Sequence, residues 1–174
     1  MGRLYFHQNH KELLQEASGI AEEVTSDFFK LGPGNWRRAR YDILTLEALA
    51  REEISAHAQA LVAKYRGKPH NRALPSASFD FYRVCLQDHN ILKALQSRED
   101  LALFPLLVYI VTHELVHIVR FSQFLALFEA SEEQKRQEEK RVHRLTQKIL
   151  EPFKYLDMPP VLRYYEHHWQ GGWQ

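Results

Sequence analysis

The chain has 174 residues and a mass of 20.6 kDa, enough for one domain with a substantial core. Apolar residues make up 45% of it and charged residues 26%, which excludes disordered and fibrous proteins. The 23 basic and 22 acidic residues nearly cancel, so we expect no nucleic acid as a primary partner.

The cellular compartment is indicated by cysteine content and by apolar runs. A single cysteine, Cys85, excludes an intramolecular disulfide and any multi-cysteine metal site, and it favours a reducing compartment. The first ten residues contain no apolar stretch long enough for a signal peptide. The longest apolar run, residues 101–111, falls short of the roughly 20 residues that span a bilayer. We therefore expect a cytoplasmic protein without a membrane segment.

The first half of the chain is predicted to contain two helices. Residues 10–31 carry apolar side chains at three- and four-residue steps, typical of an amphipathic helix, and Gly32-Pro33-Gly34 ends it. A basic loop follows at residues 36–40, and a second helix is predicted over residues 45–65, with Thr45 as its N-cap. Residues 68–78, with two prolines, are predicted to form a surface loop or lid.

The second half is predicted to be helical as well. Residues 78–86 fit either a strand or a helix, and we favour a helix. The central helix is predicted over residues 101–128, with Asp100 as its cap and Pro105 in its early turns. Ser131 and Gln134 form a capping box for the next helix, which ends near Leu150.

These elements predict a mainly α fold, a single helical metal-binding domain over residues 1–174. A short connection between the central helix and the next one should make them an antiparallel hairpin. At most one short strand is expected.

The central helix carries one chemical motif, His113-Glu114-Leu115-Val116-His117. Helix positions four apart lie about 40° apart around the axis, so both imidazoles can bind one metal ion, with Glu114 at the edge of the same face. In a hydrolytic mechanism the metal lowers the pKa of its bound water, and the glutamate takes the proton from that water. The alternative interpretation is a set of hydrogen-bonded core residues. Burying these three groups without a metal would cost several kcal/mol that something must offset.

This stretch resembles the active-site helix of the zincin metallopeptidases, which has the pattern His-Glu-x-x-His in an uncharged, hydrophobic setting. The resemblance covers roughly ten residues and does not select a family among the zincins. It implies that His113 and His117 bind zinc and that Glu114 is the general base. Zincins usually carry a sheet whose edge strand aligns the peptide substrate. Residues 78–86 are the only strand candidate here, which weakens a peptidase interpretation.

A catalytic site needs a third protein ligand. The hairpin brings the positions near residues 139–143 opposite His117, and Glu139 and His143 lie four apart on one face. We expect His143 first and Glu139 second, either as a ligand or as an acceptor that orients an imidazole. Glu138 would need a different rotation of the helix. Both glutamates also fit a solvated charged face.

The function expected from the motif is a zinc-dependent hydrolase that acts on a peptide or amide-like bond, with a peptide or small molecule as substrate. One alternative is a mononuclear iron or manganese protein with a helical bundle, in which Glu53 and His57 add ligands. The other is a non-catalytic protein whose metal is a structural element, closed by four ligands: His113, His117, Glu139 and His143.

Two further segments have alternative interpretations. Tyr164 and Tyr165 could close over a metal site, with a tyrosine donating to a developing oxyanion, or pack as an aromatic terminal segment. The basic stretch Arg37, Arg38 and Arg40 could bind an anionic group or lie in a solvated loop.

Overall fold

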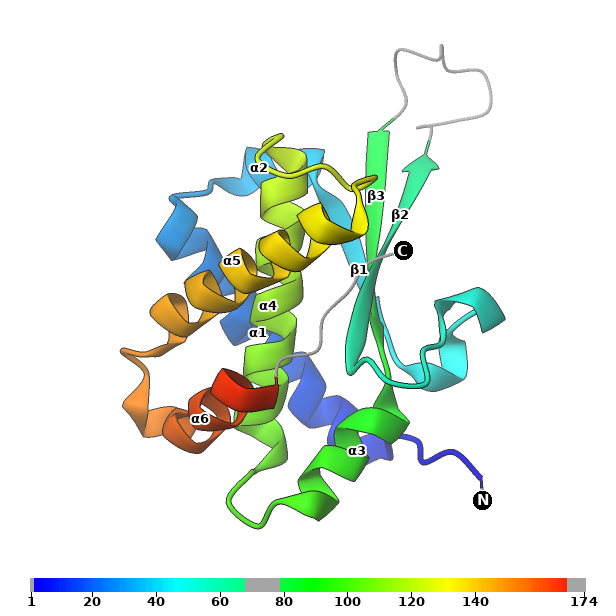
Figure 1. Cartoon of the computed structure of the whole chain (residues 1–174), viewed down its shortest axis with the longest axis vertical. Helices are drawn as coiled ribbons and strands as arrows, with labels where there is room; N and C mark the ends of the chain where they lie inside the picture. Colours follow the sequence, from blue (N-terminus) through cyan, green and yellow to red (C-terminus); the bar gives the residue numbers. More distant parts are fainter. Residues whose placement is uncertain (1, 68–78, 169–174) are drawn as a thin grey trace.

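A three-stranded mixed sheet packs with six α-helices in the computed structural model, which describes residues 2–67 and 79–168 (Figure 1). The strands lie in the order β1-β3-β2. The short strand β1 (Arg40–Leu44) runs parallel to β3 (Phe79–Leu86), and β2 (Ala60–Gly67) runs antiparallel to β3. The expectation of a mainly α fold is therefore wrong, and the protein is an α+β protein.

Pairing between distant segments produces this sheet. Residues 45–65, predicted as one helix, instead form two short 3₁₀ turns, η1 (Leu46–Ala48) and η2 (Arg51–Glu53), followed by β2. The side chain of Gln87, just after β3, bonds the backbone of Glu53 and Ser55 and holds this irregular segment. Residues 79–86 form the central strand rather than a helix. The predicted basic loop at residues 36–40 is instead the end of a short helix, up to Arg38, and the start of β1 at Arg40. The predicted loop at 68–78 lies outside the described residues.

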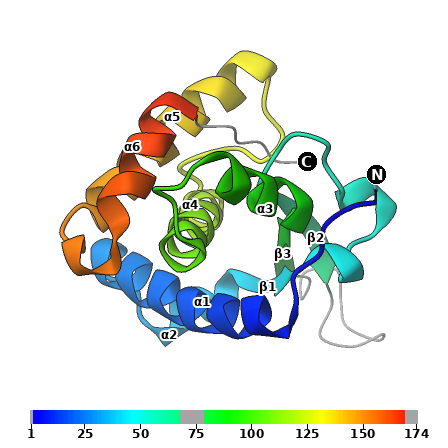
Figure 2. The ribbon, with the colours of Figure 1, turned by 90° about the horizontal axis from the view of Figure 1, so that it is seen from below.

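The helices cover one face of the sheet and surround a central helix. The long N-terminal helix α1 (Gln8–Phe29) agrees with its amphipathic pattern to within two residues at each end. Two short helices follow, α2 (Pro33–Arg38) and α3 (Asp88–Ser97). The central helix is α4 (Leu103–Ser122), and Figure 2 shows it in the middle of the molecule, with α1 on one side and α6 (Met158–His168) on another.

Every residue of α4 from Pro105 to Phe121 is buried. By length and composition this helix could cross a membrane, but 89% of its apolar window is buried inside the fold. It ends at Ser122, six residues before the predicted end, because Phe124 takes a positive φ of 57° and the Arg120 carbonyl accepts from Leu125 and Ala126. Ala102 takes the N-cap position that the sequence assigned to Asp100.

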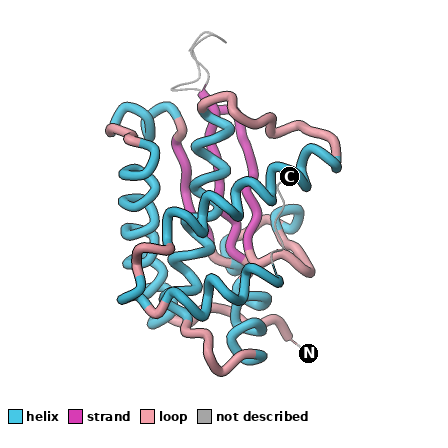
Figure 3. The backbone as a smooth tube through the Cα atoms, turned by 60° about the vertical axis from the view of Figure 1, so that its left-hand side comes forward, coloured by secondary structure: helices cyan, strands magenta, loops and turns pink. Residues whose placement is uncertain are grey.

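The helix α5 (Glu132–Leu150) begins with the predicted capping box, in which Ser131 and Gln134 bond each other. It runs back along α4 and crosses it at an angle (Figure 1, Figure 3). The connection, residues 123–131, is longer than predicted. This crossing brings the middle of α5 over the motif on α4.

Candidate metal centre

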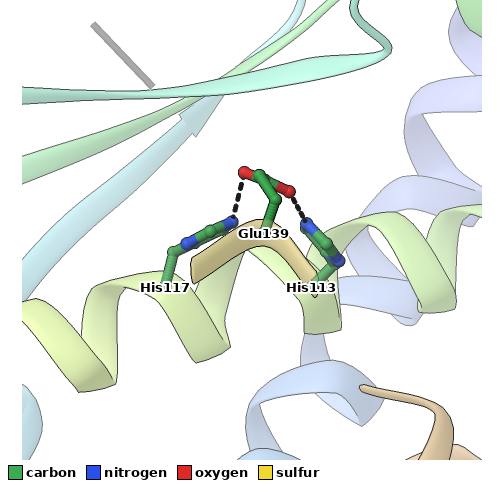
Figure 4. Close-up of side chains that lie close together, drawn as sticks. All are labelled: His113, His117 and Glu139. Carbon is green, nitrogen blue, oxygen red and sulfur yellow. Dashed lines mark hydrogen bonds and ion pairs between the residues drawn. The ribbon is translucent and has the colours of Figure 1, made fainter. Parts of the chain in front are cut away.

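Two imidazoles of α4 face one carboxylate of α5 (Figure 4). His113 and His117 are one helical turn apart on α4, and their ring centroids are 4.9 Å apart. His113 Nε2 lies 3.2 Å from Glu139 Oε2, and His117 Nε2 lies 2.9 Å from Glu139 Oε1. All three residues are buried. Within residues 2–67 and 79–168 they are the one group of histidine, cysteine or acidic residues whose ligand atoms converge, all within 4.8 Å of one another.

The spacing of these donor atoms fits a small divalent cation. Zinc binds nitrogen and oxygen ligands at about 2.0–2.2 Å, so donors around a tetrahedral ion lie about 3.3 Å apart. The contacts between Glu139 and the two imidazoles are already close to that separation. Two imidazoles with one carboxylate also match the ligand types that zinc takes in catalytic sites. The three residues therefore fit zinc.

Glu114 lies beside this group and is buried, with 4% of its surface exposed. Its Oε2 atom has no hydrogen-bond partner among the described residues. Glu114 lines a small cavity of about 20 Å³. The other residues around this cavity are Gln59, Ala60, Tyr109, Ile110, His113 and Tyr165. That volume holds about one water molecule. Glu114 therefore borders a space in which one water can lie next to His113.

The two buried carboxylates have pKa values shifted in opposite directions. Burial raises the pKa of Glu114, against the opposing charges of His113 and His117. Burial would also raise the pKa of Glu139, but the adjacent His117 and His113 hold it well below its ordinary value. Burial opposes the charged form of His113, but the bond to Glu139 raises the pKa of His113 overall. The surroundings thus disfavour the charged form of Glu114 and favour the charged form of Glu139, the form in which a carboxylate binds a metal.

The structure places His143 outside the ligand group, although the sequence ranked it first as third ligand. It lies one turn beyond Glu139 on α5, and its Nδ1 is 2.6 Å from the hydroxyl of Tyr109. Burial, followed by the charge of His113, lowers the pKa of His143 to about 4, so the imidazole is neutral near pH 7. The four-ligand closed site that included His143 is thus absent from the described residues.

The other candidates for ligation lie elsewhere. Glu138 turns to the buried Arg120 and accepts from two of its three guanidinium nitrogens, Nε and, at 3.3 Å, Nη2. Glu53 accepts hydrogen bonds from Tyr65 and Arg83 on the far side of the sheet, and His57 is exposed. None of the three belongs to the ligand group.

Two tyrosines line the cavity beside Glu114. The sequence left Tyr165 open between site and packing. The structure shows the packing: its ring stacks on Tyr109 with centroids 3.9 Å apart, and its hydroxyl donates to Gln59. It also lines the cavity, whereas a role toward an oxyanion stays a prediction. Burial raises the pKa of both tyrosines well above 10, so both hydroxyls stay protonated. Sequence reasoning missed Tyr109. Its position four residues before His113, on the same helix face, was the available signal.

The sequence matches no protein-family model and no curated protein, and the structure matches no solved structure.

Proposed function

We propose that this protein is a metal-dependent hydrolase that cleaves a peptide or amide-like bond, with zinc held by His113, His117 and Glu139. The observation that carries the proposal is the position of Glu114: a buried residue with an unpartnered carboxylate oxygen lines a cavity for one water, and His113, one of the three converging ligands, lines the same cavity. Three protein ligands leave a coordination position open, which is typical of catalytic zinc.

Within this site Glu114 is the proton carrier. Its carboxylate accepts a proton from the attacking water and delivers it to the leaving group. When bound, zinc supplies the Lewis acid that polarises the scissile carbonyl and lowers the pKa of water. The hydroxyls of Tyr109 and Tyr165 stay protonated, so these two cavity-lining residues add no negative charge beside Glu114.

The sheet supports a peptide as substrate. The sequence offered only one strand candidate, whereas the structure has three strands with β2 on the outside of the sheet. Gln59 and Ala60, at the start of β2, line the cavity with His113 and Glu114. Alternate residues of an outer strand point their N–H and C=O groups away from the sheet, which suits an extended peptide. Exposure along β2 increases away from the cavity: Ala60 to Val62 are buried, and Lys64 to Arg66 are exposed.

The test combines metal analysis with turnover on untagged protein. We expect about one zinc per chain in the wild type, and loss of that zinc in His117→Ala and in Glu139→Ala. Glu114→Gln should keep the metal, while cleavage of a mixture of unstructured peptides, followed by mass spectrometry, falls about a hundredfold or more. His57→Ala, at an exposed position away from the site, is the matched histidine control and should keep both zinc and turnover.

Each component can fail separately. Unchanged turnover in Glu114→Gln would overturn the hydrolytic mechanism. Zinc that is retained in Glu139→Ala but lost in His143→Ala would overturn the assignment of the third ligand. Iron or manganese in place of zinc would favour the mononuclear alternative.

A further inference from the structure

A groove of about 830 Å³ lies between α1 and β1, at the sheet edge opposite the strand that lines the metal centre. One wall comes from α1, with Lys11, Gln15 and Glu22, and the other from β1, with Arg40 and Tyr41. Figure 2 and Figure 3 show α1 running alongside β1. Pockets of roughly 300–1,000 Å³ are the size that proteins use to hold ligands. This groove is independent of the proposed hydrolytic site.

The backbone of β1 has an open side in this groove. The strand pairs with β3 on one side only, and no backbone hydrogen bond joins its other side to any part of the chain that the structure describes. Every second residue of such a strand turns its N–H and C=O groups outward. An unpaired edge of this kind binds an extended polypeptide, because only a second backbone supplies matching donors and acceptors at strand spacing.

The charge of the groove that no ion pair neutralises is positive on balance. Asp42 is held by Arg83 at 3.0 Å, whereas Glu22 accepts from the neutral hydroxyl of Tyr41 and makes no ion pair among the described residues, so its charge offsets that of one of the groove's two arginines. Lys11 pairs with Glu47. In contrast, neither Arg37 nor Arg40 makes an ion pair with a carboxylate among the described residues; the guanidinium of Arg40 lies 4.4 Å from the ring centroid of Phe79.

We propose that this groove binds an extended, acidic polypeptide segment, which adds to β1 as a fourth strand and directs carboxylates to Arg37 and Arg40. The open strand edge requires a backbone partner. The two arginines select its charge, because neither has a carboxylate partner among the described residues, although Nε of Arg40 donates to the Arg37 carbonyl at 3.3 Å. The same two arginines belong to the basic stretch that the sequence left open between anion binding and solvation. A nucleic acid is disfavoured, because it offers no strand edge and the chain carries a net charge of only +1.

The test uses the full chain and three fluorescein-labelled octapeptides, measured by fluorescence anisotropy. The first alternates glutamate and valine, the second alternates lysine and valine, and the third is the first with a central proline that prevents strand pairing. We expect the first to bind at least tenfold tighter than the other two. Arg40→Glu should weaken its binding roughly tenfold. Arg163→Glu, the same charge change at an exposed site on α6, should leave it unchanged.

Hydrogen exchange measured by mass spectrometry reports strand addition directly. The bound peptide should slow amide exchange in residues 40–44. Equal binding of the proline-containing peptide, or equal competition by a short single-stranded DNA, would overturn the proposal in favour of non-specific anion binding. Absence of binding by all three peptides would also overturn it. The circular dichroism spectrum and the zinc content of Arg40→Glu should equal those of the wild type. Such equality establishes that the variant is folded and that its weaker peptide binding is not caused by unfolding.

Discussion

Two neighbouring glutamates of α5 have different roles, although the sequence presents both in one charged run. Glu139 faces His113 and His117, whereas Glu138, about 100° further around the helix, faces Arg120. Both side chains of the Arg120–Glu138 pair are buried. A second nitrogen of Arg120 also donates to the carbonyl of Leu125, which ties the pair to the connection after α4. Glu138 therefore belongs to a buried ion pair, and Glu139 belongs to the candidate ligand group.

The first prediction at this scale concerns Glu138. Glu138→Ala leaves the buried guanidinium of Arg120 without its partner, so we expect the free energy of unfolding to fall by about 3–5 kcal/mol in urea titrations. Replacing both residues by apolar ones, Arg120→Met with Glu138→Leu, should recover most of this loss, because no buried charge is left uncompensated. A double variant as unstable as the single one would contradict this account.

At the scale of elements, Glu53 joins a 3₁₀ turn to two strands. Its side chain accepts from the hydroxyl of Tyr65 on β2 at 2.6 Å and from Arg83 on β3 at 3.4 Å. It also accepts from the backbone of Ala50 within its own turn. Burial opposes ionisation, but the bonds from Tyr65 and Ala50 and the charge of Arg83 lower the pKa of Glu53 overall. These contacts hold the turn η2 on the sheet face away from α4.

The lowered pKa of Glu53 predicts a pH-dependent contribution to stability. The pKa of a glutamate in the unfolded chain is about 4.3. A carboxyl group whose pKa is lower in the folded state stabilises the fold at any pH above about 4.3. This stabilisation is lost as the pH falls through the pKa of the folded state. Glu53→Gln should thus lower the free energy of unfolding by about 1–3 kcal/mol at pH 7. The difference between variant and wild type should shrink below pH 4. Urea titrations at pH 7 and pH 3.5 measure it, and an equal difference at both would contradict the assignment.

At the scale of the whole molecule, the candidate ligands come from two different helices. His113 and His117 belong to the buried central helix α4, and Glu139 belongs to α5, which also packs on α1 and α6. A metal bound by all three would connect these helices in the folded state only. Metal binding at this candidate site would therefore be linked to global stability.

This linkage predicts the effect of metal removal. A metal present at about 100 times its Kd adds about 2.7 kcal/mol, which corresponds to about 5–10 °C in Tm for a chain of this size. We expect EDTA to lower the Tm by that amount and zinc to restore it, in scanning calorimetry. Glu139→Gln serves as control and should show no response to either. A wild-type Tm that is equal with and without EDTA would contradict a folded-state metal site.

The sequence alone determined the elements whose information is local. The helix α1 follows from an apolar period that one helix face satisfies, and the start of α5 follows from a capping box that Ser131 and Gln134 close between themselves. The pattern His113-x-x-x-His117 fixed two candidate ligands in the same way, because a helix places positions four apart on one face whatever surrounds it. Glu114, next to His113, was expected at the edge of that face.

Only the tertiary structure decided the sheet and the third candidate ligand. Residues 60–67 have little intrinsic strand preference and form β2 because β3 pairs with them, a contact that no local pattern in residues 45–65 encodes. Likewise, Glu138, Glu139 and His143 were all compatible with the sequence. The angle at which α5 crosses α4 fixes its rotation and directs Glu139 to the imidazoles, Glu138 to Arg120 and His143 to Tyr109. Helix rotation depends on packing between elements, which a helix's own sequence constrains only to a broad face.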